Sequence, residues 1–422
     1  MIDKDLARIF ENAFPNTLDT TVRWHVDGTG GAQKTTRPGD REEGKWEGAQ
    51  SFIVTGDINA EWLRDSTNQL AQYQRLAKKD KKIYSLILGA INTQAEFVIE
   101  SPYCNAFQPP RPSRLSPAGE GQSDNVHPAY EPSFVFECKY ELDSLAAFLS
   151  LTNQFYSHTG STAFLTERWY TALDTLLRVL DEQEKPSFNT KTGQFERNEY
   201  TFQRNTNVGT ETLSLGGIGN PLNVGTGLIR SAFRPSDDAT ILGFFIPANA
   251  MVAIELKRTA EMLRKAGRTQ LARNLDERGE GIRAAVWEHG VVRHKIYGDV
   301  FAYEVDGYGS QIMMDDANLP SLLALPLLGF LDASDKIYQN TRKMILDKRG
   351  NPYYLKGKQF QGIGGPHIGL QNAWPMSLLV QAMTSDDDEE IERCLAFVKD
   401  ASPMGLVHES INVNLLRDYT RT

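Results

Sequence analysis

Apolar residues recur along most of this chain at the three- and four-residue spacing of helices that bury one face. Leu142, Leu145 and Leu149 follow this spacing in a run that ends at a glycine. A second run, at residues 169–180, follows after a short gap. Together the two runs predict an antiparallel pair of helices.

The same rhythm of long helix, short turn and long helix returns several times. It is expected around residues 64–99, 239–289, 319–347 and 371–400, after an opening helix near residues 5–14. Strand-like alternation is sparse. The pattern predicts about eleven helices in nearly six successive hairpins, with no linker that would split the chain. We therefore expect an all-α fold in which residues 1–422 form a single domain, a ring of helical hairpins with a concave floor.

Two stretches rich in glycine and proline interrupt this rhythm, at residues 28–48 and 105–133. Loops of this length inside a compact domain usually carry function or move. We expect both stretches as insertions in the domain, and we expect a site where loops gather at one end of the ring.

The composition of the 422-residue chain is that of an ordinary globular protein, with a net charge of −9. Because both signs of charge are scattered, we expect no nucleic-acid partner. No apolar window of about 18 residues exists, and the first residues lack the apolar stretch of a signal peptide. These features predict no contact with a membrane and a cytoplasmic location, with a secretory route left open if the sequence belongs to a longer protein.

The residues that most often bind metals show no ligand spacing. Cys104, Cys138 and Cys394 have neither metal-ligand nor redox-pair spacing, and we expect them to be structural thiols. His367 and His408 invite a zinc hypothesis, but no HExxH or comparably tight motif supports it. We therefore expect neither a metal nor another cofactor.

Trp62, Arg64 and Asp65 stand close together in the segment of residues 55–66. Such a group would suit a sugar, because an indole packs on the C–H face of the ring while a carboxylate and a guanidinium bind its hydroxyls. The alternative is a helix start with Asp65 and Ser66 at the cap and Trp62 in the core. Taken alone, this segment favours the alternative.

Glu137, Tyr140 and Glu141 would share one face of a predicted helix, with Asp143 nearby. A polar face of a surface helix explains this spacing as well as a binding site does.

Ser236, Asp237 and Asp238 precede a long apolar run. The structural interpretation makes Ser236 the N-cap of a helix and places both aspartates in its first turn, where the helix dipole lowers their pKa. A general acid needs the opposite shift. One of the two aspartates would therefore have to be desolvated or held protonated by its neighbour's charge.

Two glycine-rich stretches, residues 303–309 and 362–367, lie near the acidic pair Asp315 and Asp316 and near Trp374. A phosphate cradle is not expected, because carboxylates would repel the ligand and no P-loop lysine follows. Carboxylates, tryptophans and glycine loops on a helical ring point instead to glycoside hydrolysis, which needs two carboxyl groups across a sugar ring. Spacing alone does not identify the pair.

Together these segments resemble glycoside hydrolase family 125, the exo-acting α-1,6-mannosidases, and most of all its fungal members. The resemblance runs in the family's order from residues 14–21 to residues 408–410. The strings that carry it are Thr55-Gly-Asp57, Trp62-Leu-Arg-Asp-Ser66, Lys139-Tyr-Glu141, Ser231-Ala-Phe-Arg-Pro-Ser-Asp-Asp238, Met314-Asp-Asp316 and His408-Glu-Ser410.

The resemblance implies an (α/α)6 barrel and a metal-independent enzyme that removes terminal, non-reducing α-1,6-linked mannose with inversion. Asp237 would be its general acid and Glu409 its general base. By similarity, the residues that line the terminal-mannose subsite would be Trp62, Arg64, Asp65, Glu137, Asp143, Asp238, Asp315, His367 and Trp374. Mannose-terminated glycans or manno-oligosaccharides would be its substrates.

The chain departs from the family pattern at three places. Glu61 stands where bacterial members have an apolar residue, and Arg230 replaces a tryptophan; both could alter the leaving-group side. Family members continue after residues 408–410 into a final helix, so we expect the last helix of the barrel to be missing here. Two alternatives stay open: another inverting six-hairpin α-glycosidase, and a catalytically inactive glycan-binding protein.

Overall fold

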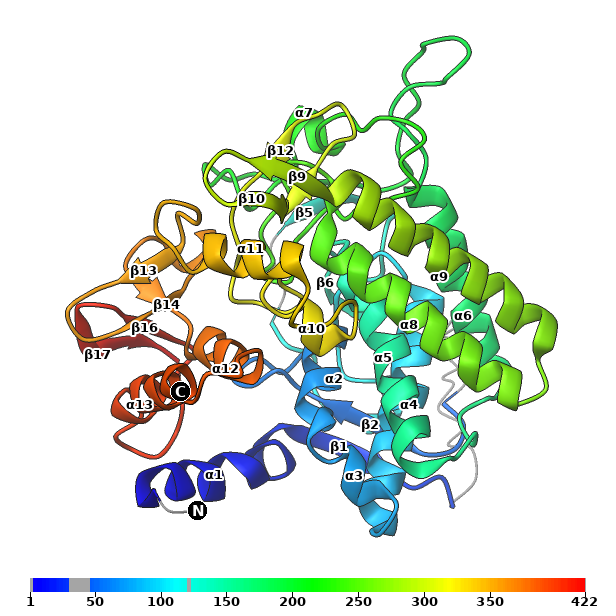
Figure 1. Cartoon of the computed structure of the whole chain (residues 1–422). Coiled ribbons are helices and arrows are strands. Elements are labelled where there is room, and N and C mark those ends of the chain that lie inside the picture. Colours follow the sequence, from blue (N-terminus) through cyan, green and yellow to red (C-terminus); the bar gives the residue numbers. More distant parts are fainter. Residues whose placement is uncertain (1–2, 30–45, 120–122, 422) are drawn as a thin grey trace.

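The computed structural model describes residues 3–29, 46–119 and 123–421 (Figure 1). Helices dominate this part of the chain. They are α1 (Lys4–Asn16), α2 (Leu63–Ala71), α3 (Gln74–Ala77), α4 (Lys81–Glu100), α5 (Leu142–Thr159), α6 (Glu167–Gln183), α7 (Ser214–Gly217), α8 (Ile246–Lys265), α9 (Thr269–Gly290), α10 (Leu325–Leu328), α11 (Lys336–Ile345), α12 (Pro375–Met383) and α13 (Asp388–Asp400). A π-helical turn (Thr17–Thr21) and two 3₁₀ turns (Arg111–Ser113 and Pro366–Ile368) complete the helical segments described.

The helices pack in two layers. In the inner layer α5 lies between α2 and α8, and α10 also contacts α8 (Figure 1). The partners α4, α6, α9 and α13 form the outer layer: α4 packs on α5, α6 on α4, α9 on α8, and α13 on α12. The predicted helical pairs are confirmed at residues 64–99, 239–289 and 371–400, whereas the pair expected at 319–347 has a first helix of only four residues, α10.

Local chemistry explains where several helices begin and end. The side chain of Asp80 caps α4 by accepting hydrogen bonds from the backbone N–H groups of Lys82 and Ile83, at 2.7 and 3.2 Å. Helix α5 ends at Gly160, whose φ of 70° lies in the left-handed region that glycine adopts most readily. The expected break near Gly267 is the turn between α8 and α9.

The chain is rich in helices, but an all-α fold is not confirmed, because short strands form seven antiparallel sheets within the described residues. The two-stranded sheets are β1 (Val22–Val26) with β2 (Gln50–Ile53), β5 (Asp124–His127) with β7 (Thr201–Arg204), β9 (Val291–His294) with β10 (Gly298–Phe301), and β13 (Tyr354–Lys356) with β14 (Gln361–Ile363). The three-stranded sheets are β3 (Glu61–Trp62), β4 (Ala106–Phe107) and β6 (Val135–Glu137); β8 (Phe244–Phe245), β11 (Glu304–Val305) and β12 (Gln311–Ile312); and β15 (Asn372–Ala373), β16 (Ser410–Asn412) and β17 (Leu415–Thr420).

Each three-stranded sheet adjoins the amino end of an inner-layer helix or of α12. Strand β3 runs directly into α2, and β8 directly into α8. Strand β15 ends one residue before Trp374, the N-cap of α12. These sheets therefore fix the backbone at the helix ends where the sequence concentrates carboxylates, an arrangement in which the helix dipoles also favour negative charge.

The two expected insertions are described only in part. Residues 30–45 of the first and 120–122 of the second lie outside the described residues. The remainder of the second is not irregular throughout, because it contains β4 and β5. Strand β5 pairs with β7, which connects this stretch to a segment about 80 residues further along the chain. Arg204 also donates one hydrogen bond to each carboxylate oxygen of Asp124.

Cys104 and Cys138 form a disulfide, so the expectation of free thiols is wrong for these two residues. They flank β4 and β6, which pair antiparallel and bring the two positions together despite their separation of 34 residues. Cys394 is a buried free thiol, as expected. Along the described part of the chain, no helix has both the length and the apolar surface that crossing a bilayer requires.

Candidate active site

Arg64, near the start of α2, holds three carboxyl groups together. Its Nη1 donates to Glu141 Oε2 at 2.6 Å and to Asp143 Oδ2 at 3.4 Å, and its Nη2 lies 3.1 Å from Asp65 Oδ2. The side chains of Glu141 and Asp143 are fully buried. Burial raises the pKa of Asp143 to about 6, although the charge of Arg64 opposes this shift. The structure thus brings Arg64, Asp65 and Asp143 together, as a shared binding site requires.

Asp237 does not lie in a helix, so the structural interpretation with Ser236 as N-cap is wrong. It sits in a tight turn with a φ of 65°, in the left-handed region that is uncommon outside glycine. The turn is closed by a hydrogen bond from the backbone N–H of Asp237 to the carbonyl of Arg234 at 2.9 Å, and by one from the N–H of Arg234 to the carbonyl of Asp238 at 2.8 Å. Helix α8 begins only at Ile246, nine residues after Asp237. Backbone conformations of this kind cluster at functional sites.

Backbone hydrogen bonds join the Asp237 turn to the segment that carries Glu141. The N–H groups of Ala232 and Phe233 donate to the carbonyl of Tyr140 at 3.1 and 2.9 Å. The N–H of Leu142 donates to Ser231 Oγ at 3.0 Å. Since Glu141 lies between the two residues so bonded, its side chain is placed beside the turn. Helix α5 starts only at Leu142 and Glu137 belongs to β6, so the expected common helix face of Glu137, Tyr140 and Glu141 does not exist.

The surroundings of Asp237 favour its ionised form. Burial opposes ionisation, but the charges of Lys139 and Arg64 and a hydrogen bond from Glu141 outweigh it and lower the pKa of Asp237. Asn105 also donates to Asp237 Oδ1, at 3.1 Å. The helix dipole invoked from the sequence is therefore not the cause of the lowered pKa.

Asp238, His367 and Trp374 form a second group next to the turn. Asp238 is buried and accepts a hydrogen bond from Ser236 Oγ at 3.1 Å. His367 Nδ1 lies 4.0 Å from Asp238 Oδ1, and the imidazole stacks on the Trp374 ring with 6.5 Å between centroids. The predicted residues at the amino end of α12 therefore meet those of the Asp237 turn.

Of the acidic pair Asp315 and Asp316, the second lies closer to this group. Asp315 accepts hydrogen bonds at 2.9 Å from the backbone N–H groups of Leu322 and Leu323, and it holds the following loop in place. A Cβ on Gly365 would come within 2.6 Å of Asp316 Oδ2 and 3.0 Å of the Trp374 ring. The hydrogen bonds of Asp315 favour a structural role for it, and Asp316, which the sequence marked only as its acidic neighbour, is the better candidate to contact a sugar.

Trp62 and Glu137 lie in the sheet of β3, β4 and β6. Trp62 is buried and packs edge-on against Phe136, with 5.5 Å between ring centroids. Glu137 accepts a hydrogen bond from Arg204 Nη2 at 2.9 Å and lies 3.2 Å from Lys139 Nζ. Glu137 therefore forms an ion pair with Lys139, the cation whose charge also interacts with Asp237.

Glu409 immediately precedes β16, and one third of its side chain is exposed. Its nearest charged neighbour is Arg421, with 3.8 Å between Nε and Oε2, and Arg421 also lies 3.6 Å from Asp57. Strand β16 pairs with β15, which leads to Trp374, so Glu409 is carried by the same sheet that adjoins the group of His367 and Trp374.

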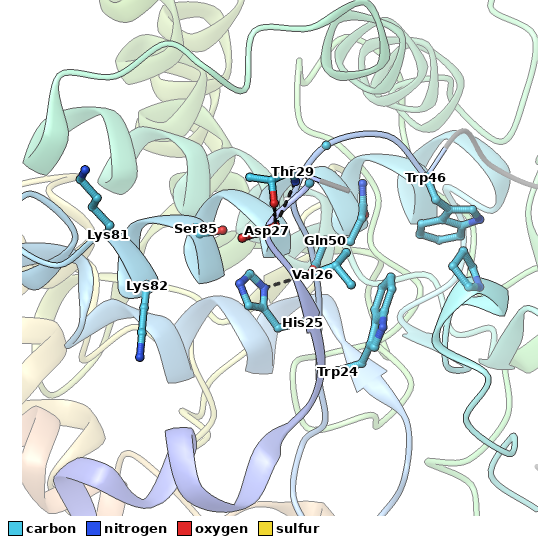
Figure 2. A pocket seen from close by; sticks show the side chains of 13 residues that line it. Trp24, His25, Val26, Asp27, Thr29, Trp46, Gln50, Lys81, Lys82 and Ser85 are labelled. Atoms are coloured by element: carbon cyan, nitrogen blue, oxygen red, sulfur yellow. Dashed lines mark hydrogen bonds between the residues drawn. The ribbon is translucent and has the colours of Figure 1, made fainter. Parts of the chain in front are cut away.

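Two cavities formed by the described residues contain neither Asp237 nor Glu409. The first, of about 700 Å³, is shown in Figure 2, where Trp24, His25 and Asp27 of β1 and its turn face Lys82 of α4 and Trp46. The second, of about 930 Å³, lies between α2, α5 and α8. Its wall includes Arg64, the residue that also binds the carboxyl groups described above.

The two departures from the family pattern are both buried. Glu61 accepts a hydrogen bond from the N–H of Ile53 at 2.9 Å, and burial raises its pKa to about 8. Burial lowers the pKa of Arg230 to about 10, and its Nη2 reaches only Ser187 Oγ, at 3.5 Å. An effect of either residue on the leaving-group side stays a prediction.

Two residues near the site, Asn105 and Lys139, were missed from the sequence, and two others, Glu141 and Asp316, were noted there only as acidic neighbours of the predicted site residues. Lys139 and Glu141 stand inside a string that carried the family resemblance, which was a usable signal. Asn105 carried none, because its two carboxylate partners are 36 and 132 residues away. Within the described residues, no group of three His, Cys, Asp or Glu side chains is arranged to hold a metal ion.

Buried carboxyl groups beside tryptophan and histidine rings, gathered at the amino ends of paired helices, define a helical glycoside hydrolase. The family model of the metal-independent α-mannosidases of glycoside hydrolase family 125 matches residues 3–422. The chain belongs to this family.

Relatives in fungi and bacteria agree with this assignment. The chain is 54% identical over 420 residues to the Meiotically up-regulated gene 157 protein of Schizosaccharomyces pombe, spanning 99% of this chain and 79% of that protein. It superposes with a TM-score of 0.83, at 29% identity, on a Streptococcus pneumoniae metal-independent α-mannosidase in a non-productive complex with α-1,6-mannobiose; the match covers 99% of this chain and 90% of that one. A solved glycosidase at 13% identity and a TM-score of 0.51 shares the fold alone.

Proposed function

We propose that this α-mannosidase removes terminal, non-reducing α-1,6-linked mannose from glycans on an (α/α)6 barrel, with Asp237 as general acid and Glu409 as general base. The observation that carries the proposal is the placement of Asp237, on a turn in the left-handed conformation beside Arg64, Lys139 and Glu141. The complex of the Streptococcus pneumoniae relative with α-1,6-mannobiose supports the linkage. Residues 1–422 form one catalytic domain in this proposal, with 28–48 and 105–133 as its insertions.

The reaction is a single displacement. Protonated Asp237 gives its proton to the glycosidic oxygen while the bond from that oxygen to the anomeric carbon breaks. Ionised Glu409 takes a proton from the water that attacks the opposite face of the sugar. Because the water enters opposite the leaving group, the mannose is released with inverted configuration.

The residues around the acid bind the terminal mannose. Arg64, Asp65 and Asp143 offer donors and acceptors for the sugar hydroxyls on one side, and charge-assisted hydrogen bonds of this kind are strong and directional. On the other side Asp238, Asp316 and His367 do the same, with Trp374 beside them. Trp62 and Glu137 support this subsite from the sheet behind it, and Asp315 supports it through the loop backbone.

The disulfide bears on the compartment in which the enzyme works. Disulfides persist in oxidising compartments and are rare in the cytosol. The bond between Cys104 and Cys138 therefore favours a secretory or extracellular setting over the cytoplasm that the sequence suggested.

The proposal is tested by the anomer that is released first. With α-1,6-mannobiose as substrate, proton NMR should show β-mannose at early times, with α-mannose appearing only by mutarotation. Initial release of α-mannose would overturn the single-displacement mechanism. The alternative of another α-glycosidase is tested with nitrophenyl glycosides of glucose and rhamnose and with α-1,2- and α-1,3-mannobiose. If the protein binds such sugars but cleaves none of them, it is an inactive glycan-binding protein.

A second expectation concerns metal removal. Because two carboxyl groups suffice for the proposed chemistry, exhaustive treatment with EDTA should leave kcat and KM for α-1,6-mannobiose unchanged. Activity that is lost with EDTA and restored by calcium or zinc would show that an ion orients the sugar hydroxyls, contrary to the proposal.

A further inference from the structure

The proposed acid faces a difficulty that its surroundings create. A general acid must carry a proton when the bond breaks, and its pKa should lie near the working pH. Lys139 and Arg64 instead lower the pKa of Asp237, so this carboxyl by itself would be ionised near neutrality. A nearby group must therefore retain the proton for it.

Glu141 and Asp237 lie side by side, because Asn105 Nδ2 donates to a carboxyl oxygen of each, and contact between the two carboxyl groups raises the pKa of Glu141 and lowers that of Asp237. A hydrogen bond between two carboxyl groups requires that one of them carries a proton, since two carboxylates in contact would repel. Burial raises the pKa of Glu141 well above its ordinary value, although Arg64 opposes the shift. The pair therefore retains one proton.

Asn105 fixes the two carboxyl groups relative to each other. Its Nδ2 donates to Glu141 Oε1 and to Asp237 Oδ1, both at 3.1 Å, which uses both amide hydrogens. Its Oδ1 accepts from the backbone N–H of Lys139 at 3.1 Å, so the amide has one orientation. Because Cys104 and Cys138 are bonded to each other directly beside Asn105 and Lys139, the bridge is held by a covalent link.

We propose that Glu141 and Asp237 share a single proton and that Glu141 is the positioning residue that returns this proton to Asp237 for donation to the leaving group. The proposal rests on the proposed role of Asp237 as general acid. Before cleavage the proton passes along the hydrogen bond from Glu141 to Asp237, which leaves Glu141 as a carboxylate paired with Arg64. Asp237 then gives the proton to the glycosidic oxygen as the glycosidic bond breaks. The proton of the attacking water goes to Glu409, and exchange with solvent restores both sites.

Several charged and titratable groups surround Glu141 and Asp237, and positive and negative groups have opposite effects on whether the pair keeps its proton. The cations Arg64 and Lys139 and the imidazole of His367 favour the ionised forms, while the neighbouring acids favour retention of the proton. The groups in question are Arg64, Asp65, Lys139, Asp143, Tyr200 and His367. Loss of the shared proton would leave two adjacent carboxylates, so the pair should retain it to a higher pH than Asp237 would alone.

The test is the pH profile of Glu141→Gln, which preserves shape and a donor toward Asp237 but cannot hold the shared proton. For α-1,6-mannobiose, the alkaline limb of kcat/KM should move down by about one pH unit or more, since Lys139 and Arg64 then act on Asp237 unopposed. At neutral pH the variant should lose roughly tenfold or more of kcat on this substrate. On dinitrophenyl α-mannoside, whose leaving group needs no proton, kcat should stay within a few-fold of wild type.

Asp143→Asn is the matched control, because Asp143 is equally buried and also bonded to Arg64 but has no hydrogen bond to Asp237. Its alkaline limb should shift by less than about half a unit, whatever it does to KM. If Glu141→Gln leaves the limb in place, or weakens both substrates equally through KM, Glu141 only binds sugar and the proton-sharing proposal is wrong.

Asp237→Asn distinguishes this failure from failure of the proposed function. If Asp237→Asn loses mannobiose cleavage but retains dinitrophenyl mannoside cleavage while Glu141→Gln has no shifted limb, only the proton sharing is wrong. If Asp237→Asn cleaves both substrates normally, the assignment of the acid itself is wrong.

Discussion

Asp237→Asn is expected to reduce kcat/KM for α-1,6-mannobiose by roughly 10²–10⁴-fold, the usual contribution of general acid catalysis. The same variant should keep most of its activity on dinitrophenyl α-mannoside. A sugar alkoxide leaves only with a proton, whereas the dinitrophenolate departs unaided. Steady-state kinetics of the two substrates with the same enzyme preparation give the contrast directly, and asparagine changes the shape of the side chain little, so the comparison reports chemistry.

Two further variants serve as comparisons for Asp237→Asn. Glu409→Gln should be poor on both substrates, because water must be activated whatever leaves. Asp238→Asn, next to the acid and within 4.0 Å of His367, should lower activity without dependence on the leaving group. If Asp238→Asn keeps its activity on dinitrophenyl α-mannoside while losing that on α-1,6-mannobiose, and Asp237→Asn does not, the general acid is Asp238.

The long helices could be predicted from the sequence because many residues contribute to their periodicity. Helices α5, α8 and α9 each span 18 residues or more, and their apolar positions repeat over several turns. The strands could not, because β3, β4 and β8 have two residues each, too few for alternation to be seen. Their pairing is set by the packing of the helices that follow them, which is tertiary information.

The segments that form the site could be predicted from the sequence, but their arrangement in space could not. The family strings located Arg64, Asp237 and the stretch from Lys139 to Glu141, and local rules then placed Asp237 in the first turn of a helix. The structure shows a left-handed turn instead, in a segment that hydrogen bonds from the N–H groups of Ala232 and Phe233 to the carbonyl of Tyr140 hold in place. Local capping rules cannot anticipate a conformation that distant contacts hold in place.

The disulfide and the acidic pair show the same limit. Nothing in the spacing of Cys104 and Cys138 distinguishes them from Cys394; only the pairing of β4 with β6 brings them together. Likewise Asp315 and Asp316 are adjacent in sequence, but both carboxyl oxygens of Asp315 accept hydrogen bonds from the loop backbone, whereas Oδ2 of Asp316 lies beside Gly365. Which of two neighbouring carboxyl groups faces a site depends on backbone direction, which composition and spacing do not encode.

The ion pair under the Asp237 turn should dominate the stability of this region. Arg234 Nε donates to Glu304 Oε1 at 2.6 Å, with both side chains almost fully buried. Glu304 Oε2 accepts two further hydrogen bonds at 2.9 Å, from the backbone N–H groups of Ile241 and Leu242. The Arg234 guanidinium also lies over the Tyr303 ring, 5.3 Å from its centroid. One arginine thus links the turn to strand β11 and to the loop before α8.

Arg234→Met is expected to lower the free energy of unfolding by about 3–5 kcal/mol, because it leaves the Glu304 carboxylate buried without its counter-charge. Urea unfolding of the purified variant measures this loss. Arg293→Met removes an arginine from an exposed pair with Asp299, at 3.0 Å, and should cost less than about 1 kcal/mol. The double variant Arg234→Met with Glu304→Gln should recover part of the loss, since no unpaired charge then remains. Equal losses in the two single variants, or a double variant less stable than Arg234→Met, would show that the turn is held by its backbone hydrogen bonds and not by the ion pair.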